Sequence, residues 1–498
     1  MDIFGPPSPP PSPTLPPLLP VLSLTGDAAP SREFSRTRQH RPPLSALTTL
    51  IDSALTQVRL YMYRVPTGPL AEEIDLELRH GNPAKIVNKH PWIALEDKLW
   101  QNVPTSVWTS NPEDATFFVV PHAYLLHQCV QNTELKKNYI RRGIARWFEY
   151  LYYAQPFFNR SAGRDHLTIW HYENGPLCDC NFRAGMVNET LAFDMLLTFI
   201  KVGHYGHRDR AMFGWREGID IAVPQYGAAD AVKLGPPPTW SEVVSSPRFS
   251  FGFSGSFWGQ RVTCPAIQKG APAGSLAAEH SCECSPKIRT WLKGYLEKHC
   301  DAGSAKSGNS SLGSTATAKP TFRCEGRAGK MGTFFFALCP AAWACWSSRM
   351  YHAIDRLVIP VIMANGAIQP FEAILDWRTF SVRLDTDRLI AGNTSQMDWL
   401  HREARVVVAR CQRCPTCTAC TRLPLVQRVR KLAEVRNWMA FNESTPYSVG
   451  GLLILELHCR QWHREHAASE KDGICLHYMS DQQLQEKRSE WHTSAIDK

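Results

Sequence analysis

The segment between residues 332 and 363 constrains the fold more than any other part of the chain. It holds a short apolar stretch at 332–338, then a loop, an amphipathic helix and a second apolar stretch at 359–363. Short apolar runs bounded in this way are typical of strands buried on both faces. A strand, a helix and a strand in this order predict a parallel α/β unit.

The same alternation recurs along most of the 498 residues. Strands are predicted at 58–63, 117–120, the end of 159–170, 218–227, the start of 248–256, and 379–385, with helices at 91–103 and 137–155. We therefore predict an α/β protein with two Rossmann-like domains facing a cleft, at 46–245 and 246–400. A C-terminal helical region is expected at 401–498.

The first 45 residues have a different composition. Residues 1–43 hold 12 of the 36 prolines, which predicts a disordered, extended arm over 1–45. The arm makes a poor signal peptide, because prolines interrupt its only apolar patch. Residues 301–320 predict a low-complexity loop. Because the chain has no run of eighteen apolar residues, we predict no membrane span.

Charge and cysteine content bear on partners and compartment. The net charge of +9 is spread along the chain without a dense basic block, so a nucleic-acid partner is not expected. Five N-glycosylation sequons occur, at Asn159, Asn188, Asn309, Asn393 and Asn442. Sixteen cysteines permit disulfides without proving them. The pairs Cys178/Cys180 and Cys282/Cys284 suit disulfides better than zinc, because C-x-C is a poor zinc spacing.

The helix after the first apolar stretch carries the main candidate site. Ser347 or Ser348 is a natural N-cap, and Arg349 lies in the first turn. An apolar stripe packs the helix on the sheet, formed by Met350, Ala353, Ile354 and Leu357. Arg349, His352 and Arg356 fall on a neighbouring face. A hydroxyl and a guanidinium at a helix start, just after a strand's carboxyl end, favour a diphosphate site. The alternative is that Arg349 is simply solvated.

Four segments in order resemble the exostosin family of glycosyltransferases, in its green-algal form. They are "LYMYRVP" at 60–66, "NPEDATFFVVP" at 111–121, "NRSAGRDH" at 159–166, and the stretch from Trp346 through "PFEAILDW" at 370–377 to "FSV" at 380–382. The resemblance implies a GT-B fold with an N-terminal acceptor domain and a C-terminal nucleotide-sugar domain. It also implies inverting transfer from a nucleotide sugar, a UDP-sugar above all, to a polysaccharide or glycoprotein, without an essential metal or other cofactor. A membrane-associated Golgi enzyme is expected.

The resemblance assigns roles to single residues. Ser347 and Arg349 would hold the donor diphosphate. His352 stands where the family has a carboxylate for the ribose hydroxyls, Ala342 replaces a usual Gly, and Leu357-Val358 replaces Gly-Cys. Leu357 is therefore expected in a left-handed helix end, at a cost of about 1–2 kcal/mol. These departures support a second hypothesis, a catalytically weakened or inactive scaffold.

The catalytic base should lie on the N-terminal domain near the cleft. Asp165 and His166, in the loop before a strand, are the candidates. The alternative is that this loop is fixed by internal hydrogen bonds, with Arg164 paired to Asp165.

The insert at 411–420 carries a second possible function. Cys411, Cys414, Cys417 and Cys420 are spaced C-x2-C-x2-C-x2-C. This run could bind a cluster or zinc, form disulfides, or be a loop without a ligand. It precedes a predicted helix that starts near residue 423. Metal binding by the insert belongs to the scaffold hypothesis.

Overall fold

The computed structural model describes the chain in fifteen segments. They are residues 43–64, 95–121, 147–161 without 149, 163–170, 198–207, 215–216, 219–226, 238–239, 242–243, 249–253, 286–299, 334–341, 347–411, 414–442 and 444–465. The predictions for the proline-rich arm before residue 43, the loop at 301–320, Ala342 and the two C-x-C pairs lie outside the described residues.

The N-terminal sheet is entirely parallel, with strand order β1-β2-β3-β4-β6. Its strands are β1 (Leu60–Met62), β2 (Phe117–Val119), β3 (His166–Trp170), β4 (Ile200–Gly203) and β6 (Ile221–Ala222). The helices before β4 include α1 (Leu44–Gln57), α4 (Leu95–Asn102) and α7 (Pro156–Ser161), with 3-10 turns η1 (Thr105–Val107) and η2 (Pro112–Asp114). Residues 147–154, apart from 149, are also helical, within the helix predicted at 137–155. The side chain of Asn111 caps η2, as its sequence predicts.

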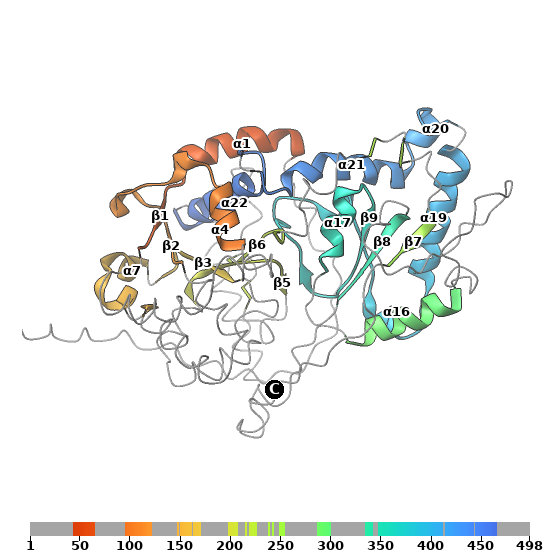
Figure 1. The fold of residues 1–498 in the computed structure, drawn as a ribbon, viewed down its shortest axis with the longest axis horizontal. Coiled ribbons are helices and arrows are strands. Elements are labelled where there is room, and N and C mark those ends of the chain that lie inside the picture. Colours follow the sequence, from red (N-terminus) through yellow and green to blue (C-terminus); the bar gives the residue numbers. More distant parts are fainter. Residues whose placement is uncertain are drawn as a thin grey trace, which may run out of the picture.

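The C-terminal sheet is also parallel, in the order β11-β9-β8-β7, and lies beside the N-terminal sheet (Figure 1). Its strands are β7 (Phe249–Gly252), β8 (Phe334–Pro340), β9 (Ile359–Met363) and β11 (Val382–Arg383). The helices of this part are α16 (Pro286–His299), α17 (Arg349–Asp355), α18 (Thr386–Ile390), α19 (Ser395–Cys411), α20 (Thr418–Thr421) and α21 (Pro424–Trp438), with the 3-10 turn η4 (Trp377–Thr379). The prediction of an α/β protein with parallel sheets is confirmed.

A small antiparallel sheet links the two parallel sheets. Its strands are β5 (Gly206–His207), which follows β4, and β10 (Ala367–Ile368), which follows β9. The imidazole Nε2 of His207 lies 3.0 Å from the carbonyl oxygen of Asn365. The amide of Phe371 donates to the carbonyl oxygen of Ala222 at the end of β6, with an N···O distance of 2.9 Å. These contacts join the edges of the two sheets to each other.

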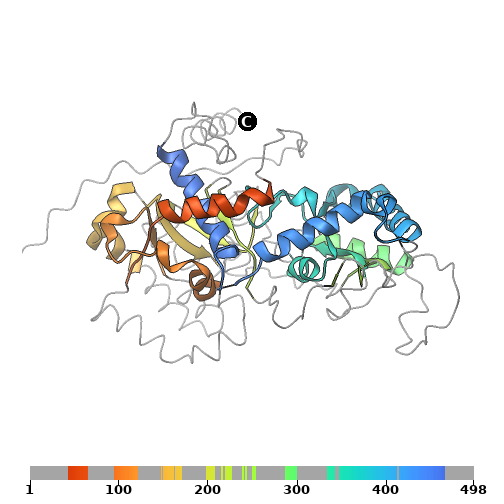
Figure 2. The ribbon, with the colours of Figure 1, turned by 90° about the horizontal axis from the view of Figure 1, so that it is seen from above.

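The last described helix, α22 (Val449–Glu465), packs on α1 and α4 (Figures 1 and 2). Gly450 permits this packing, because a Cβ there would lie 2.0 Å from the carbonyl oxygen of Asn102. Arg460 of α22 donates from Nε to the carbonyl oxygen of Ile219 at 2.7 Å. The predicted C-terminal helical region therefore returns to the N-terminal sheet. One buried apolar cluster runs from α1 through both sheets to α22.

Two local predictions are wrong in detail. The segment 159–170 is not a loop from its start, because residues 159–161 complete helix α7 before the chain turns at Gly163, which has φ +79°. Ser348 occupies the N-cap position of α17, but no serine hydroxyl caps the helix.

Within the described segments, no helix is both long and apolar enough to cross a membrane.

Candidate functional site

Arg349 is the first residue of α17, and it lies near the carboxyl ends of β7 and β8. In open parallel sheets, ligands bind at this edge. The Arg349 guanidinium packs over the ring of Phe253, the residue that follows β7, with Cζ 4.8 Å from the ring centroid. Its Nη1 donates to the hydroxyl oxygen of Ser347 at 2.9 Å. Phe253 and Ser347 therefore orient the guanidinium.

The Arg349 side chain has no acidic partner among the residues that the structure describes. Its Nε is buried and makes no hydrogen bond to a described residue. Burial lowers the pKa of Arg349, and the nearby Cys339 opposes this shift. Because a guanidinium stays protonated in proteins, the site holds a largely buried positive charge that has no counter-ion among the described residues. Such a group costs free energy unless an anion pairs with it. An anionic ligand would supply that partner.

His352 lies one turn after Arg349 and is half-buried. Burial lowers its pKa; Asp355 acts in the opposite sense, while Arg349 and Arg356 lower it further. The imidazole is therefore neutral at pH 7. A neutral imidazole offers one acceptor nitrogen, whereas a carboxylate could accept from two hydroxyls.

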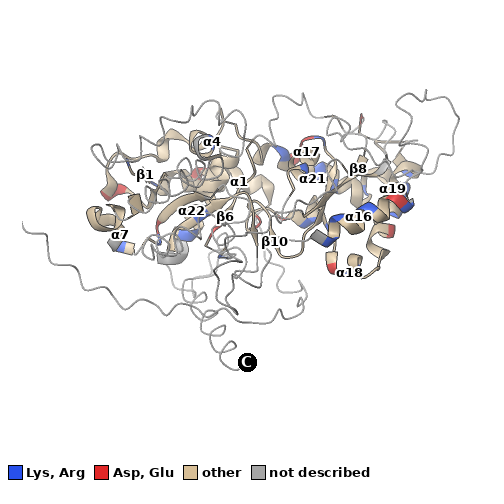
Figure 3. Ribbon diagram, turned by 60° about the horizontal axis from the view of Figure 1, so that its bottom comes forward, with Lys and Arg blue, Asp and Glu red and all other residues tan. Residues whose placement is uncertain are grey.

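Helix α17 also carries Asp355, an acidic residue that was not predicted from the sequence as part of the site. It is 5% exposed and accepts from Nε and Nη2 of Arg436 at 2.8 and 2.5 Å. Figure 3 shows basic residues on both α17 and α21, and this pair joins the two helices. Because Asp355 is already bound by Arg436, it anchors α17 to α21.

The helix ends where its sequence departs from the family pattern. Leu357 has φ +53°, so it occupies the left-handed region that favours glycine. The predicted strained conformation is confirmed. The Leu357 side chain is nevertheless 4% exposed, and its burial contributes about 1.5–3 kcal/mol. Burial thus offsets the backbone strain.

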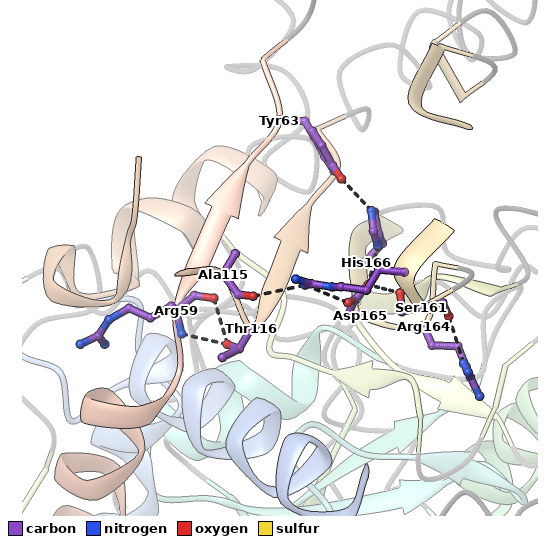
Figure 4. A network of polar contacts seen from close by, with 9 residues as sticks. Arg59, Tyr63, Ala115, Thr116, Ser161, Arg164, Asp165 and His166 are labelled. Carbon is purple, nitrogen blue, oxygen red and sulfur yellow. Dashed lines mark hydrogen bonds and ion pairs between the residues drawn. The ribbon is translucent and has the colours of Figure 1, made fainter. Parts of the chain in front are cut away.

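The other candidate pair, Asp165 and His166, lies in a closed network at the start of β3 (Figure 4). The imidazole Nδ1 donates to Oδ1 of Asp165 at 2.7 Å, and Nε2 accepts from the Tyr63 hydroxyl at 2.9 Å. The Ser161 hydroxyl also donates to Asp165 Oδ1, and Arg160 Nη2 lies 3.4 Å from Oδ2. Both imidazole nitrogens and both carboxylate oxygens therefore have partners within the chain.

The environment of this network is apolar. His166 is fully buried and stacks on the rings of Phe118 and Phe199, with centroid distances of 5.0 and 5.7 Å. Burial lowers the pKa of His166, although the hydrogen bond and charge of Asp165 act against this. Burial also raises the pKa of Tyr63, so its hydroxyl remains a donor. This geometry fits the alternative in which the side chains fix the loop.

The partner of Asp165 differs from the predicted one. Arg164 donates from Nε to the Ser161 carbonyl oxygen at 3.0 Å and is exposed, and Arg160 pairs with Asp165 instead. Arg160 reaches the carboxylate because α7 extends to Ser161 and presents it beside β2, where it also contacts the ring of Phe118. The catalytic assignment of Asp165 and His166 stays a prediction.

The cysteine insert contains a disulfide between Cys411 and Cys420. Cys414 and Cys417 are free thiols. In the described segments, no group of three or more His, Cys, Asp or Glu side chains is placed to hold a metal ion. Of the possibilities open for this run, disulfide formation is the one that the structure shows, for its outer pair.

A family model for the Exostosin GT47 domain matches residues 55–395. The chain belongs to the exostosin GT47 family. The match spans every strand of both parallel sheets and the Arg349 helix, and it confirms the resemblance that the four sequence segments indicate.

Several relatives are plant proteins named as glycosyltransferases. The chain is 23% identical over 289 residues to a probable glucuronosyltransferase of Oryza sativa subsp. japonica, a match covering 55% of this chain and 56% of that protein. It is 20% identical over 355 residues to a probable glucuronoxylan glucuronosyltransferase of Arabidopsis thaliana, covering 68% and 63%. A shorter match, 40% identical over 50 residues, joins 10% of this chain to 12% of a probable beta-1,4-xylosyltransferase of Arabidopsis thaliana. The chain thus spans somewhat more than half the length of the first two relatives.

Proposed function

We propose that this exostosin GT47 protein transfers a sugar from a UDP-sugar to a polysaccharide or glycoprotein acceptor. The observation that carries the proposal is the buried Arg349 guanidinium, which has no acidic partner among the described residues and lies near the carboxyl end of a parallel sheet. A donor diphosphate would pair with this cation, and a charged hydrogen bond contributes about 1.5–3 kcal/mol. Relatives named for glucuronosyl and xylosyl transfer make a uronosyl or pentosyl donor the first choice to test.

The two parallel sheets, in this proposal, form the acceptor-side and donor-side domains of a GT-B enzyme, at 46–245 and 246–400. Transfer proceeds with inversion, so that the acceptor hydroxyl attacks the anomeric carbon as UDP departs from the opposite face. A base on the N-terminal part must take the hydroxyl proton. Arg349 and Ser347 stabilise the negative charge that develops on the leaving diphosphate. Neither protein residue requires a metal for this role.

A weakened or inactive scaffold is the second candidate, and specific observations favour it. His352 offers a neutral ring where the family has a carboxylate, and Leu357 replaces glycine at a left-handed position. The first change affects ribose binding directly. The second is compensated by burial, so it bears on the helix end more than on the donor.

We also propose that the protein works in the Golgi lumen. The Cys411–Cys420 disulfide suits an oxidising compartment. Two sequon asparagines, Asn393 and Asn442, are exposed, and each accepts from the serine hydroxyl two residues later at 2.6 Å. A mobility shift of the native protein after treatment with a glycan-cleaving enzyme is expected. An unglycosylated cytosolic protein would contradict this placement.

A donor screen tests the activity. Purified protein is incubated with UDP-glucuronate, UDP-xylose and other UDP-sugars, together with xylan fragments or a glycoprotein acceptor, and UDP release and product mass are measured. We expect acceptor-dependent release with one donor, and at least a tenfold loss in Arg349→Ala. Binding of UDP without any transfer would favour the scaffold. If the protein shows no UDP binding and no transfer, Arg349 neither binds the donor diphosphate nor stabilises the leaving group.

A further inference from the structure

The insert between α19 and α21 contains two kinds of cysteine. Cys411 and Cys420 are fully buried and form the disulfide. Cys414 and Cys417, which lie between them in the sequence, are free and partly exposed. Because reagents in solution reach exposed sulfur atoms first, the outer bridge and the inner pair should behave differently.

The inner pair is held by a tight turn with the sequence Cys-Pro-Thr-Cys. The amide of Cys417 donates to the carbonyl oxygen of Cys414 at 3.4 Å, and Pro415 occupies the second position, where its fixed φ is favourable. Four residues in such a turn bring the first and last Cα within about 7 Å. A disulfide needs Cα atoms about 4.4–6.8 Å apart. The turn therefore brings the Cα atoms of Cys414 and Cys417 close to the separation that a bridge requires.

The two inner thiols also interact with each other. A thiol–thiol hydrogen bond raises the pKa of Cys414 and lowers the pKa of Cys417, whose thiolate receives further backbone hydrogen bonds from α20. In its protonated form the Cys417 thiol donates to the Cys414 carbonyl oxygen at 3.0 Å, which keeps the sulfur atom within the turn. The thiolate is the nucleophile in disulfide chemistry, so Cys417 is the more reactive of the two.

Cys339 provides an internal contrast. It is also a free thiol, but it lies within β8 at 3% exposure. Burial raises its pKa to about 12, which leaves almost no thiolate at neutral pH. The chain therefore holds an accessible dithiol and an inaccessible thiol under the same conditions.

We propose that Cys414 and Cys417 form a dithiol that exchanges with low-molecular-weight disulfides such as glutathione disulfide, while Cys411–Cys420 is a permanent structural bridge. This activity is separate from glycosyl transfer and does not depend on it. The Cys417 thiolate attacks one sulfur of glutathione disulfide, forms a mixed disulfide and releases one glutathione thiolate, which takes up the proton that Cys417 lost. Cys414 then loses its proton, attacks the Cys417 sulfur and releases the second glutathione. The protein dithiol is oxidised by two electrons, and glutathione disulfide is reduced to two thiols.

Peptide-resolved mass spectrometry on the full-length protein tests the proposal. The protein is equilibrated in buffers with graded ratios of glutathione to glutathione disulfide, quenched in acid, alkylated and digested. We expect a Cys414–Cys417 bridge to appear and disappear over this range, while Cys411–Cys420 stays bridged throughout. In native, reduced-glutathione buffer, the inner pair should be alkylated at least tenfold faster than Cys339. Bridges from Cys411 to Cys414 or from Cys417 to Cys420, or an inner pair no faster than Cys339, would overturn the proposal.

Two matched variants separate the roles of the inner thiols. Cys414→Ser should trap Cys417 as a stable mixed disulfide with glutathione, because the resolving thiol is missing. Cys417→Ser should take up glutathione at least tenfold more slowly. Equal uptake by both variants would contradict the assigned order of attack. The wild-type peptide map needs no variant, so a folding defect in either one leaves the main test intact.

Discussion

The two polar sites of this protein differ in whether their buried groups are satisfied. Around Asp165 and His166, both imidazole nitrogens and both carboxylate oxygens have partners within the chain. Around Arg349, the described part of the chain offers the guanidinium one serine hydroxyl and one aromatic face, and no hydrogen-bond partner for Nε. A satisfied buried network stabilises the fold, whereas an unpaired buried charge is costly unless a ligand completes it. Changes at Arg349 should therefore alter the binding of the donor, whereas changes at Asp165 or His166 should alter the stability of the fold.

Replacing Asp165 with alanine should produce the largest effect, and it should be an effect on stability. The change leaves the buried Nδ1–H of His166 without its acceptor, so we expect the free energy of unfolding to fall by about 3 kcal/mol. The UDP affinity of the folded protein should not change. Urea denaturation and calorimetry measure the two quantities.

Asp165→Asn is the matched control, because it keeps the shape of the side chain and one acceptor oxygen. It should cost less stability than alanine does. The opposite pattern, in which Asp165→Asn retains full stability and transfer falls at least about a hundredfold, would identify Asp165 as the catalytic base.

Acid should destabilise the N-terminal part. Burial lowers the pKa of His166 and lowers that of His204 to about 3, whereas both titrate near 6.5 when unfolded. Between these values the unfolded chain binds more protons, so stability falls as the pH drops below about 6.5, by up to about 1.4 kcal/mol per pH unit for each histidine. Denaturation midpoints from pH 8 to pH 5 measure the slope, and His204→Leu should flatten it. A flat profile in the parent protein would show that these histidines are not buried as neutral rings.

Leu357 tests how the Arg349 helix ends. We expect Leu357→Gly to destabilise the protein slightly, by about 1 kcal/mol, because lost burial exceeds the strain that is relieved. Leu357→Ala should be worse by about 1 kcal/mol, since alanine loses the same burial and keeps the unfavourable φ. Thermal unfolding of both variants gives the comparison. Alanine as stable as glycine would mean that the left-handed conformation carries no cost here.

His352→Glu should produce the smallest effect, a modest increase in the affinity for UDP. The new carboxylate lies one turn from Arg349 and could accept from both ribose hydroxyls. We predict that UDP binds more tightly by about 1 kcal/mol, the difference between charged and neutral hydrogen bonds. His352→Gln, which has the size of glutamate without its charge, is the control and should leave affinity near that of the parent. Weaker binding in the glutamate variant would mean that His352 itself serves the ribose.

The sequence predicted the elements whose apolar runs are uninterrupted. Strands β2 and β8 are entirely buried, and their sequences show it directly. Strand β4 was missed, because Lys201 interrupts its apolar run. Lys201 is 1% exposed, and its Nζ lies 3.1 Å from Oδ2 of Asp220. Burial alone would raise the pKa of Asp220, but Arg216 and Lys201 hold it below its usual value. A buried lysine can be recognised only when its partner is known.

The candidate site was predictable in its residues but not in its contacts. Ser347 and Arg349 follow from the strand–loop–helix pattern and the family motif. Phe253 could not be predicted as part of the site, because it follows β7 and lies 96 positions before Arg349 in the sequence. The return of α22 to the N-terminal sheet and the partner of Asp165 likewise depend on tertiary packing, which local sequence patterns do not encode.

Calorimetric titration of UDP into the parent protein, Arg349→Ala and Arg356→Ala tests whether Arg349 binds the donor diphosphate. Arg356 is the matched control, because it lies at the other end of the same helix and contacts Asp355 at 3.9 Å. We predict that Arg349→Ala weakens binding by at least about 1.5 kcal/mol, or roughly tenfold, while Arg356→Ala binds as the parent does. Equal affinity of all three proteins for UDP would contradict the assignment of the donor diphosphate to Arg349.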